Sequence, residues 1–306
     1  MMYIQDFPRQ GLSMEELDTA QLSARGSGEE FYREWERVLT SLSIPESHAI
    51  RHALQQYHFR RARAHLVASW PITSVARGWH DIEQAGLGRL GRVARTVCPN
   101  APVPGMRIEA QGSSLASYDR RWLEHFYLVA CGYSPSKVVP IASKRAEHAS
   151  PEFTRVTGSS NWPAIQVLFP TQSYVEHVSV EGSMGGGCFF GKPEEFRKRG
   201  LRCLYAQPVS SRGHLLMHAK SLLVTNHDNS CGYVYLGSHN FTRAAWGTIS
   251  GTQAQPTQSL SNWELGIVLP LTEYDAWDAI PYNRHIEPYG CLLYTSDAAD
   301  EGLGVD

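Results

Sequence analysis

Apolar positions follow two different periods along this chain. Between residues 29 and 42 they recur at helical spacing, after a glycine and a serine that are suited to a helix start. The apolar face of that segment is made by Phe31, Trp35, Val38 and Leu42. Elsewhere, short runs rich in β-branched and aromatic residues, bounded by turn-forming residues, predict strands.

Applied along the chain, these two patterns alternate. Helices are predicted over residues 29–42, 47–57, 87–97, 119–130, 194–198 and 242–246. Strands are predicted over residues 64–70, 106–110, 165–169, 201–206, 217–224, 233–236 and 264–269. The alternation predicts an α/β sandwich in which helices flank a mixed β-sheet. The Pro-rich run at residues 98–105 is the best candidate for a linker between two domains.

Bulk properties narrow the class of protein. The chain has 306 residues, 42% hydrophobic and 19% charged, which is typical of a globular protein of about two domains. No apolar run approaches the roughly 20 residues that span a bilayer, and the start lacks a secretory signal, so no membrane partner is expected. Six cysteines without C-x-x-C spacing argue against a structural zinc site and a disulfide framework, and no cofactor is predicted. The net charge of −2 requires any nucleic acid to bind in a local groove.

One pair of strands carries candidate chemistry. His218 and Lys220 are two residues apart in the first strand, so they are expected on the same face. A polar turn at residues 226–232 returns the chain, and Asn240 follows the second strand just before a short helix. An ammonium and an amide can hold phosphate oxygens, and an imidazole can move protons or attack phosphorus. The alternative reading of His218 is a buried histidine with its hydrogen bonds satisfied.

Two further sequence patterns, a glycine motif and a group of arginines, have simple structural explanations. Residues 86–91 fit G-x-G-x-x-G, but no strand directly precedes them, and Gln111 replaces the expected acid, so we interpret them as a Gly-rich helix start. A group of arginines predicts either a basic rim or ordinary charged surface. Its members are Arg60, Arg61, Arg63, Arg89, Arg92 and Arg95.

The spacing H-x-K followed by G-S-x-N resembles a half-site of the phospholipase D superfamily. Thr225 stands where most members have an Asp, and S-H-N-F-T-R-A-A-W-G with the later W-E-L-G is similar to the tyrosyl-DNA phosphodiesterase family. Q-G-S-S-L-A-S, the glycine run at 185–187 and P-Y-G at 288–290 follow in the family's order, so the resemblance covers about residues 1–290. It implies a phospholipase D-like layered fold and a hydrolase that needs no metal.

The resemblance also implies roles for individual residues. His218, Lys220 and Asn240 would be catalytic, with His218 protonating the tyrosine leaving group and then activating the water that hydrolyses a phosphohistidine. Glu264 would orient the attacking histidine of the other half. Four further residues would contact DNA, although turn chemistry explains them equally simply. They are Ser114, Ser117, Gly186 and Gly187, followed by Cys188 where the family often has Ser.

The sequence contains one H-x-K…N set, whereas the family uses two. We therefore expect residues 1–98 to be the remnant of a first domain, 99–290 to be the second domain, and 291–306 to be an unrelated tail. The expected function is nuclear DNA repair on single-stranded or nicked DNA with 3′-blocked ends that carry a topoisomerase-derived peptide. We expect a monomer that is inactive alone. The alternatives are a nuclease that completes its site by homodimerisation and a DNA-end-binding module without turnover.

Overall fold

The computed structural model describes residues 27–76, 78–103, 105–138, 149, 153–154, 157, 161–191, 204–272, 276–284 and 286–288. The helices in these ranges are α2 (Ser27–Ser41), α3 (Ala49–Gln55), α4 (Trp79–Ile82), α5 (Gly86–Val97), α6 (Arg120–Ala130), α7 (Pro135–Val138), α9 (Gln172–His177), the 3₁₀ helix η3 (Gly182–Cys188) and α11 (Arg243–Trp246). The strands are β1 (His65–Ser69), β2 (Ile72–Val75), β3 (Arg107–Gln111), β4 (Ile165–Leu168), β5 (Tyr205–Gln207), β6 (Lys220–Thr225), β7 (Gly232–Gly237), β8 (Thr248–Gly251), β9 (Pro256–Leu260), β10 (Glu264–Pro270) and β11 (Glu287–Pro288).

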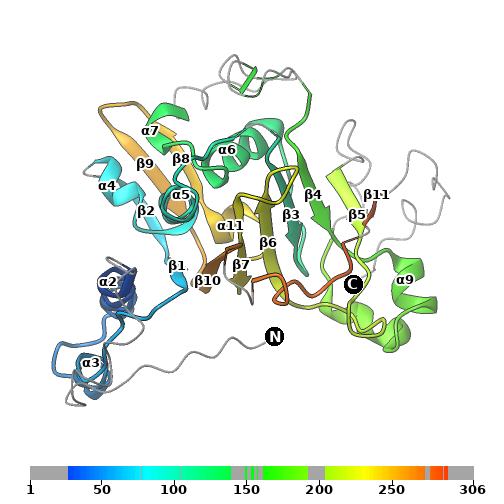
Figure 1. Cartoon of the computed structure of the whole chain (residues 1–306), viewed down its shortest axis with the longest axis horizontal. Helices are drawn as coiled ribbons and strands as arrows, with labels where there is room; N and C mark the ends of the chain where they lie inside the picture. Colours follow the sequence, from blue (N-terminus) through cyan, green and yellow to red (C-terminus); the bar gives the residue numbers. More distant parts are fainter. Residues whose placement is uncertain are drawn as a thin grey trace.

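A mixed sheet forms the centre of the molecule (Figure 1). Within the described part of the chain it has eight strands in the order β1-β10-β7-β6-β3-β4-β5-β11. Strands β3, β4 and β5 run parallel, and the other pairings are antiparallel. The predicted α/β architecture with a mixed sheet is confirmed.

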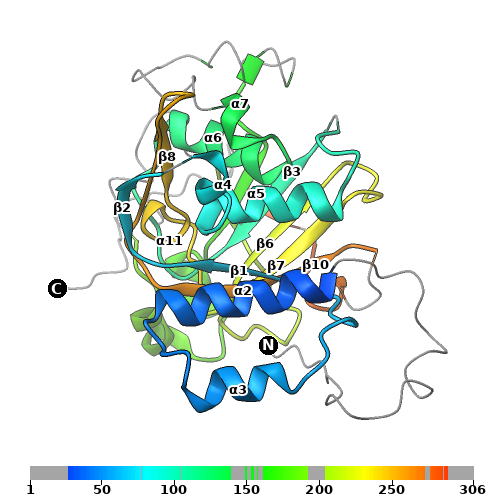
Figure 2. The same cartoon turned by 90° about the vertical axis from the view of Figure 1, so that its left-hand side faces the viewer.

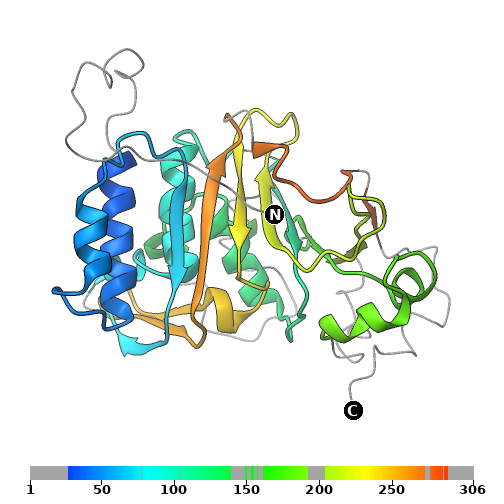
Figure 3. The same cartoon turned by 90° about the horizontal axis from the view of Figure 1, so that it is seen from below.

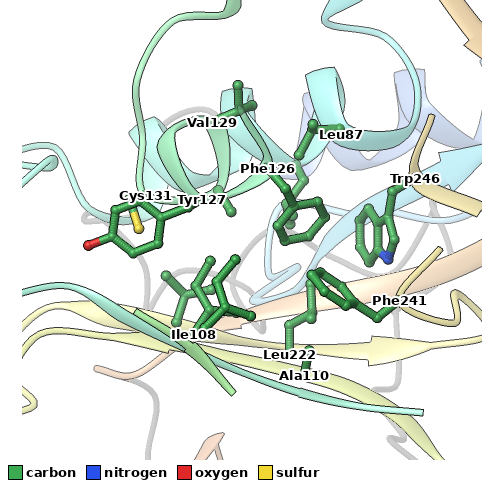
Figure 4. Packing of buried hydrophobic residues seen from close by; sticks show 14 of the residues in the cluster. Leu87, Ile108, Ala110, Phe126, Tyr127, Val129, Cys131, Leu222, Phe241 and Trp246 are labelled. Carbon is green, nitrogen blue, oxygen red and sulfur yellow. The ribbon is translucent and has the colours of Figure 1, made fainter. Parts of the chain in front are cut away.

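Helices α5 and α6 cover one face of this sheet and enclose the main core (Figure 1). Phe126 of α6 meets Phe241 at a ring-centroid distance of 4.8 Å and Trp246 at 5.6 Å, both edge to face (Figure 4). Strand residues such as Ile108 and Leu222 complete the layer from below (Figure 4). The segment that follows the candidate site is therefore anchored in the core, because Phe241 and Trp246 flank α11's start and end.

Helix α2 lies beside the sheet edge formed by β1, and α3 packs next to it (Figures 2 and 3). Phe31 of α2 contacts Phe59 at a ring-centroid distance of 5.6 Å and shares a small apolar cluster with Leu66 of β1. The amphipathic pattern predicted for residues 29–42 is thus the face that closes this edge.

A small second sheet joins β2, β9 and β8 in antiparallel order. The sequence pattern did not predict these strands. Most other predicted elements agree with the structure to within about two residues. The predicted helix at 194–198 and the predicted tail at 291–306 lie outside the described residues.

The core continues across the predicted domain boundary at residues 98–105. Before that segment, β1 pairs with β10 and α5 packs against α6. Val67 and Leu87 lie in the same buried cluster as Phe126 and Leu222. The described residues before 98 therefore form one packing unit with those after it.

The glycine pattern at 86–91 builds close packing, as the helix-start interpretation predicted. Gly86 has φ +52 at the start of α5, a conformation that favours glycine. A Cβ on Gly88 would lie 1.9 Å from the Ile82 backbone oxygen, and one on Gly91 would lie 2.5 Å from a Val129 methyl group. These glycines let α5 approach α4 and α6.

A basic rim does not form around Arg89. Its side chain is fully buried, where it donates to Glu30 Oε1 at 2.7 Å and to the Leu66 carbonyl oxygen at 3.0 Å. Arg92 lies 3.4 Å from the same Glu30 carboxylate, and Arg95 pairs with Glu83. These arginines connect α5 to neighbouring helices.

Candidate active site

The ends of four adjacent strands bring the candidate residues to one edge of the sheet. Strand β6 begins at Lys220, which pairs with Gly237 at the end of β7, and Gly237 pairs with Gly266 of β10. Because β6 is antiparallel to both β7 and β3, its first residues lie beside the last residues of those strands. Glu264 starts β10 at the same edge.

His218 and Lys220 contact each other directly. Lys220 is buried, and its Nζ lies 3.0 Å from Nδ1 and 3.2 Å from Nε2 of His218. The ammonium also donates to the His218 backbone oxygen at 2.6 Å. His218 precedes β6 rather than lying in it, so the contact comes from the lysine folding back onto the residue two positions earlier.

The surroundings of the two groups lower the pKa of each. Partial burial lowers the pKa of His218, and the nearby Lys220 ammonium lowers it further. Burial also lowers the pKa of Lys220, whereas the Glu264 carboxylate and Cys188 act in the opposite direction. A bound anion would favour the charged forms of both side chains.

Asn240 organises the neighbouring loop. Its Oδ1 accepts hydrogen bonds from the backbone N–H groups of Ser113 at 2.9 Å and Ser114 at 3.1 Å. A Cβ on Gly112 would lie 3.0 Å from that same oxygen. No hydrogen bond joins Asn240 to His218 or Lys220 among the described residues. The amide therefore fixes the segment after β3, and its Nδ2 group is available to donate.

Glu264 is held by two polar neighbours. Its Oε2 accepts a hydrogen bond from the Ser238 hydroxyl, and its Oε1 accepts from Asn262 Nδ2 at 3.0 Å. The Ser238 oxygen in turn accepts from Leu265 N at 3.0 Å. The sequence singled out Glu264 but not Ser238 or Asn262, although Ser238 lies inside the G-S-x-N signature.

The other nearby histidines bond elsewhere. His239 is buried between the Ser69 hydroxyl, 2.8 Å from Nε2, and the Tyr235 hydroxyl on Nδ1, and it stacks on Trp246. Burial lowers the pKa of His239 to about 3. His80 contacts Gln84. In the described part of the chain, no histidine hydrogen-bonds to Glu264.

An open pocket of about 430 Å³ lies next to these groups. It includes two predicted DNA contacts, Ser114 and Ser117, together with Asn240. Its full lining is Ser114, Ala116, Ser117, Asn240, Thr242, Arg243, Ala244 and Asn262. Sequence reasoning missed Arg243, which pairs with Asp119, and Asn262, which connects the pocket wall to Glu264.

Gly186 and Gly187 belong to η3. Gly186 is buried and accepts a hydrogen bond from Phe189 N at 2.9 Å, whereas Gly187 is exposed. A Cβ on Gly187 would meet nothing within 4 Å, so packing does not require glycine there. Cys188 follows at the end of η3, close enough to Lys220 to influence its pKa. A contact between these glycines and a phosphate stays a prediction.

No group of three or more His, Cys, Asp or Glu side chains in the described ranges is arranged to bind a metal ion. None of the described helices is long and apolar enough to cross a membrane.

Comparison with known proteins now assigns the chain. A family model described as tyrosyl-DNA phosphodiesterase matches residues 2–301. This chain belongs to the tyrosyl-DNA phosphodiesterase family. The family name describes a phosphodiesterase, which is a hydrolase.

The fold agrees with a solved member of the tyrosyl-DNA phosphodiesterase family. The crystal structure of the yeast tyrosyl-DNA phosphodiesterase superposes with a TM-score of 0.59 at 14% sequence identity, over 86% of this chain. The matched region is 64% of the yeast chain. No curated protein gives a significant sequence match. The predicted phospholipase D-like fold is confirmed.

Proposed function

We propose that this protein binds the 3′-phosphoryl ends of DNA and contributes one half of a phosphodiesterase site. The observation that carries the proposal is the buried Lys220 ammonium, which contacts the His218 ring but lacks a hydrogen-bonded carboxylate in the described part of the chain. Its nearest anionic influence, Glu264, already accepts hydrogen bonds from Ser238 and Asn262. A buried cation in this state favours an anionic ligand.

Each residue has a role at the phosphate. Lys220 and the Asn240 Nδ2 group would hold non-bridging oxygens, which is electrostatic stabilisation of the kind that acyl and phosphoryl transfer need. As a second imidazole attacks phosphorus and forms a P–N bond, His218 would donate a proton to the tyrosine oxygen of the breaking P–O bond. It would later accept a proton from the water that forms a new P–O bond and cleaves the P–N bond. Glu264 would orient a second imidazole.

The pocket beside Asn240 would take the DNA strand. Ser114, Ser117 and Thr242 present hydroxyl groups there, and Arg243 adds a cation. Hydroxyl groups, backbone N–H groups and arginines are the usual partners of DNA phosphates. The partner is thus single-stranded or nicked DNA with a blocked 3′ end, including ends that carry a topoisomerase-derived peptide. The corresponding role is in the nuclear repair of DNA ends, where this chain, as a monomer, would supply one half of an exonucleolytic site.

Turnover requires a second H-x-K…N set, and this sequence carries one. General acid help from His218 alone supplies about 10²–10⁴-fold, well short of the about 10⁶-fold or more that enzymes reach. We therefore expect binding without release of tyrosine.

The test combines a gel assay for tyrosine release from a 3′-phosphotyrosyl oligonucleotide with a fluorescence-anisotropy titration of the same ligand. The variants are His218→Ala and, as a matched control, His227→Ala, an exposed histidine in the turn between β6 and β7. The expected result is salt-sensitive binding by the parent without turnover.

Two results contradict this proposal in different ways. Turnover that His218→Ala abolishes and that rises with the square of protein concentration would establish a homodimeric enzyme. Binding that neither salt nor Lys220→Met changes would show that the phosphate is not held at this site.

A further inference from the structure

Phe190 is a large aromatic side chain exposed beside the candidate site. Half of its surface is accessible, while the adjacent Phe189 is buried against Phe169 at a ring-centroid distance of 5.6 Å. Isolated exposed apolar residues are common on protein surfaces. What distinguishes Phe190 is its place between two parts of the site: it is bridged to Ser114 of the pocket and follows Phe189, whose ring lies near the His218 ring.

Backbone hydrogen bonds fix the position of Phe190. Its N–H donates to the Ser113 oxygen at 2.9 Å, and its carbonyl accepts from Leu115 N at 2.8 Å, so it forms a parallel bridge with Ser114. Bridged residues project to the same side of a ladder. The ring therefore extends on the side to which Ser114 points, and Ser114 lines the pocket.

The chain before Phe190 leads back to the ammonium group. Phe189 is extended, so Cys188 and Phe190 project to the same side. Cys188 is close enough to Lys220 to influence its pKa, and the Phe189 ring lies 6.5 Å from the His218 ring. Phe190 is thus the next side chain along from the group beside Lys220.

Phe190 and Asn240 flank the Ser113–Leu115 segment from opposite sides. Asn240 bonds the backbone N–H groups of this segment and lines the pocket, whereas Phe190 does not line it. A phosphodiester at Lys220 has two ester substituents, which extend from the phosphorus atom in different directions. If the DNA strand occupies the pocket on the Asn240 side, the other substituent emerges toward Phe190.

We infer that Phe190 recognises the leaving group of the substrate by stacking on its aromatic ring. The inference rests on the proposed function, since it takes the pocket as the DNA side and His218 as the proton donor to the leaving oxygen. It makes Phe190 a specificity-determining residue for aryl esters such as the tyrosyl ester. An alkyl ester of the same charge would use the phosphate contacts alone.

The experiment measures affinity, so it does not depend on turnover by this chain. Two single-stranded oligonucleotides are compared by anisotropy, one ending in a 3′-(4-methylphenyl) phosphodiester and the other in a 3′-propyl phosphodiester. We expect the parent to bind the aryl ester about 3- to 10-fold more tightly, as one aromatic contact allows. Phe190→Leu should reduce this preference to less than about 2-fold, and Phe190→Tyr should keep it.

Further variants separate the two levels of the argument. Lys220→Met should weaken both esters equally if the proposed function holds. If it does so while Phe190→Leu leaves the aryl preference intact, the inference about Phe190 is overturned and the proposed function stands. A third outcome concerns the DNA base. If Phe190→Leu weakens the binding of both esters, and does so only when the terminal nucleotide carries a base, the ring stacks on that base and the inference is also overturned. Loss of all salt-sensitive binding in the parent would remove the proposed function itself.

Discussion

Two buried cations in this molecule have opposite surroundings. Arg89 of α5 is enclosed at the junction with α2, where Glu30 and Glu34 lie 2.7 and 3.3 Å from its Nη1 and the Leu66 oxygen lies 3.0 Å from its Nε. Lys220 at the sheet edge is buried less deeply, and its polar contacts are the His218 ring nitrogens and the His218 backbone oxygen. One cation has its counter-charges, and the other has neutral partners.

The difference separates structural from functional charge. Removing either partner of a buried ion pair with good geometry strongly destabilises the fold, because the remaining charge is left uncompensated. Burial lowers the pKa of both cations, but only at Arg89 does a hydrogen-bonded carboxylate oppose the shift; at Lys220 the charges of Glu264 and Cys188 oppose it without a hydrogen bond. Such a group is maintained at a cost to stability, which is typical of binding and catalytic sites.

Two histidines repeat the contrast at the same edge of the sheet. His239 is enclosed by Ser69, Tyr235 and Trp246, whereas His218 is exposed on one side and contacts Lys220. The first stabilises the segment that leads into Asn240. The second has a ring free to meet a ligand. If enclosed and ligand-facing groups differ in this way, substitutions at Arg89 and His239 should change stability, and substitutions at Lys220 and His218 should change binding.

Replacing Arg89 should produce the largest loss of stability. Arg89→Met removes the ion pairs to Glu30 and to the buried Glu34, which keeps only its hydrogen bond from Arg37 among the described residues, and should lower the free energy of unfolding by about 3 kcal/mol. Denaturant titration measures the loss. The control is Arg33→Gln, which breaks an exposed pair with Glu29 and should cost less than about 1 kcal/mol.

A second substitution sharpens this result. Arg89→Met combined with Glu34→Leu removes both buried charges and should recover part of the lost stability. The losses of unfolding free energy in the three variants are compared. If the double variant loses more than the two single variants lose together, the arginine contributes through packing rather than through its charge.

Acid should destabilise the protein through its enclosed histidines. Burial lowers the pKa of His239 to about 3 and that of His125 to about 4, against about 6.5 in the unfolded chain. The unfolded state therefore binds more protons below pH 6.5, so stability is fullest above that value and falls as the pH drops toward 4. Each histidine should contribute about 1.4 kcal/mol per pH unit in this window.

Thermal unfolding of His239→Gln at pH 7.5 and pH 5 checks the assignment. The variant should be less stable at pH 7.5, because it loses the bonds to Ser69 and Tyr235, but its stability should decline less on acidification. The exposed His227→Gln serves as the control. Equal acid sensitivity in the parent and His239→Gln would place the effect in other groups.

Local patterns in the sequence predicted the fold where each element carries a strong signal of its own. Strands β6 and β10 contain the apolar runs L-L-V and I-V-L, and α6 begins after Asp119, whose carboxylate caps the helix at Trp122 N. The strands β2, β8 and β9 were missed because runs such as T-I-S-G have little apolar character. They become strands through pairing with each other, which no local window contains.

The site shows the same limit. The spacing of His218 and Lys220 predicted that they share one face of a strand, but His218 precedes β6, and their contact arises because the lysine folds back onto it. The bond from Asn240 to the Ser113 backbone joins residues 127 positions apart, and its only signal is the family's motif order. The sequence predicted Arg89 to lie in a basic rim or on ordinary charged surface. Nothing in the local sequence around an arginine shows that a carboxylate from a distant segment pairs with it in the core.

Replacing Lys220 should affect binding and leave the fold intact. Lys220→Met should weaken the affinity for a 3′-phosphoryl single-stranded oligonucleotide about 10-fold and lower the magnitude of the salt slope by about 0.7. Its thermal stability should equal or exceed that of the parent, because a partly desolvated cation is removed. Lys137→Met, at an exposed position of α7, is the matched control. A strong loss of stability in Lys220→Met would make the lysine structural and cancel the contrast with Arg89.

The smallest effect should be the pH dependence of ligand binding. In the free protein, partial burial and the Lys220 charge lower the pKa of His218, and a bound phosphodiester anion would raise it again. The bound state then holds more protons, so affinity should rise as the pH falls, by about 3-fold between pH 7.5 and 5.5. A phosphodiester is required as ligand, since a terminal monoester titrates in this range itself, near pH 6.

Variants identify the group that titrates. His218→Gln should flatten the curve of affinity against pH, and His227→Gln should not. Lys220→Met should shift the curve upward in pH, because the cation that lowers the pKa of His218 is gone. A curve that keeps its position in Lys220→Met would mean that the ring does not sense the lysine, and that the contact between them is not an electrostatic one.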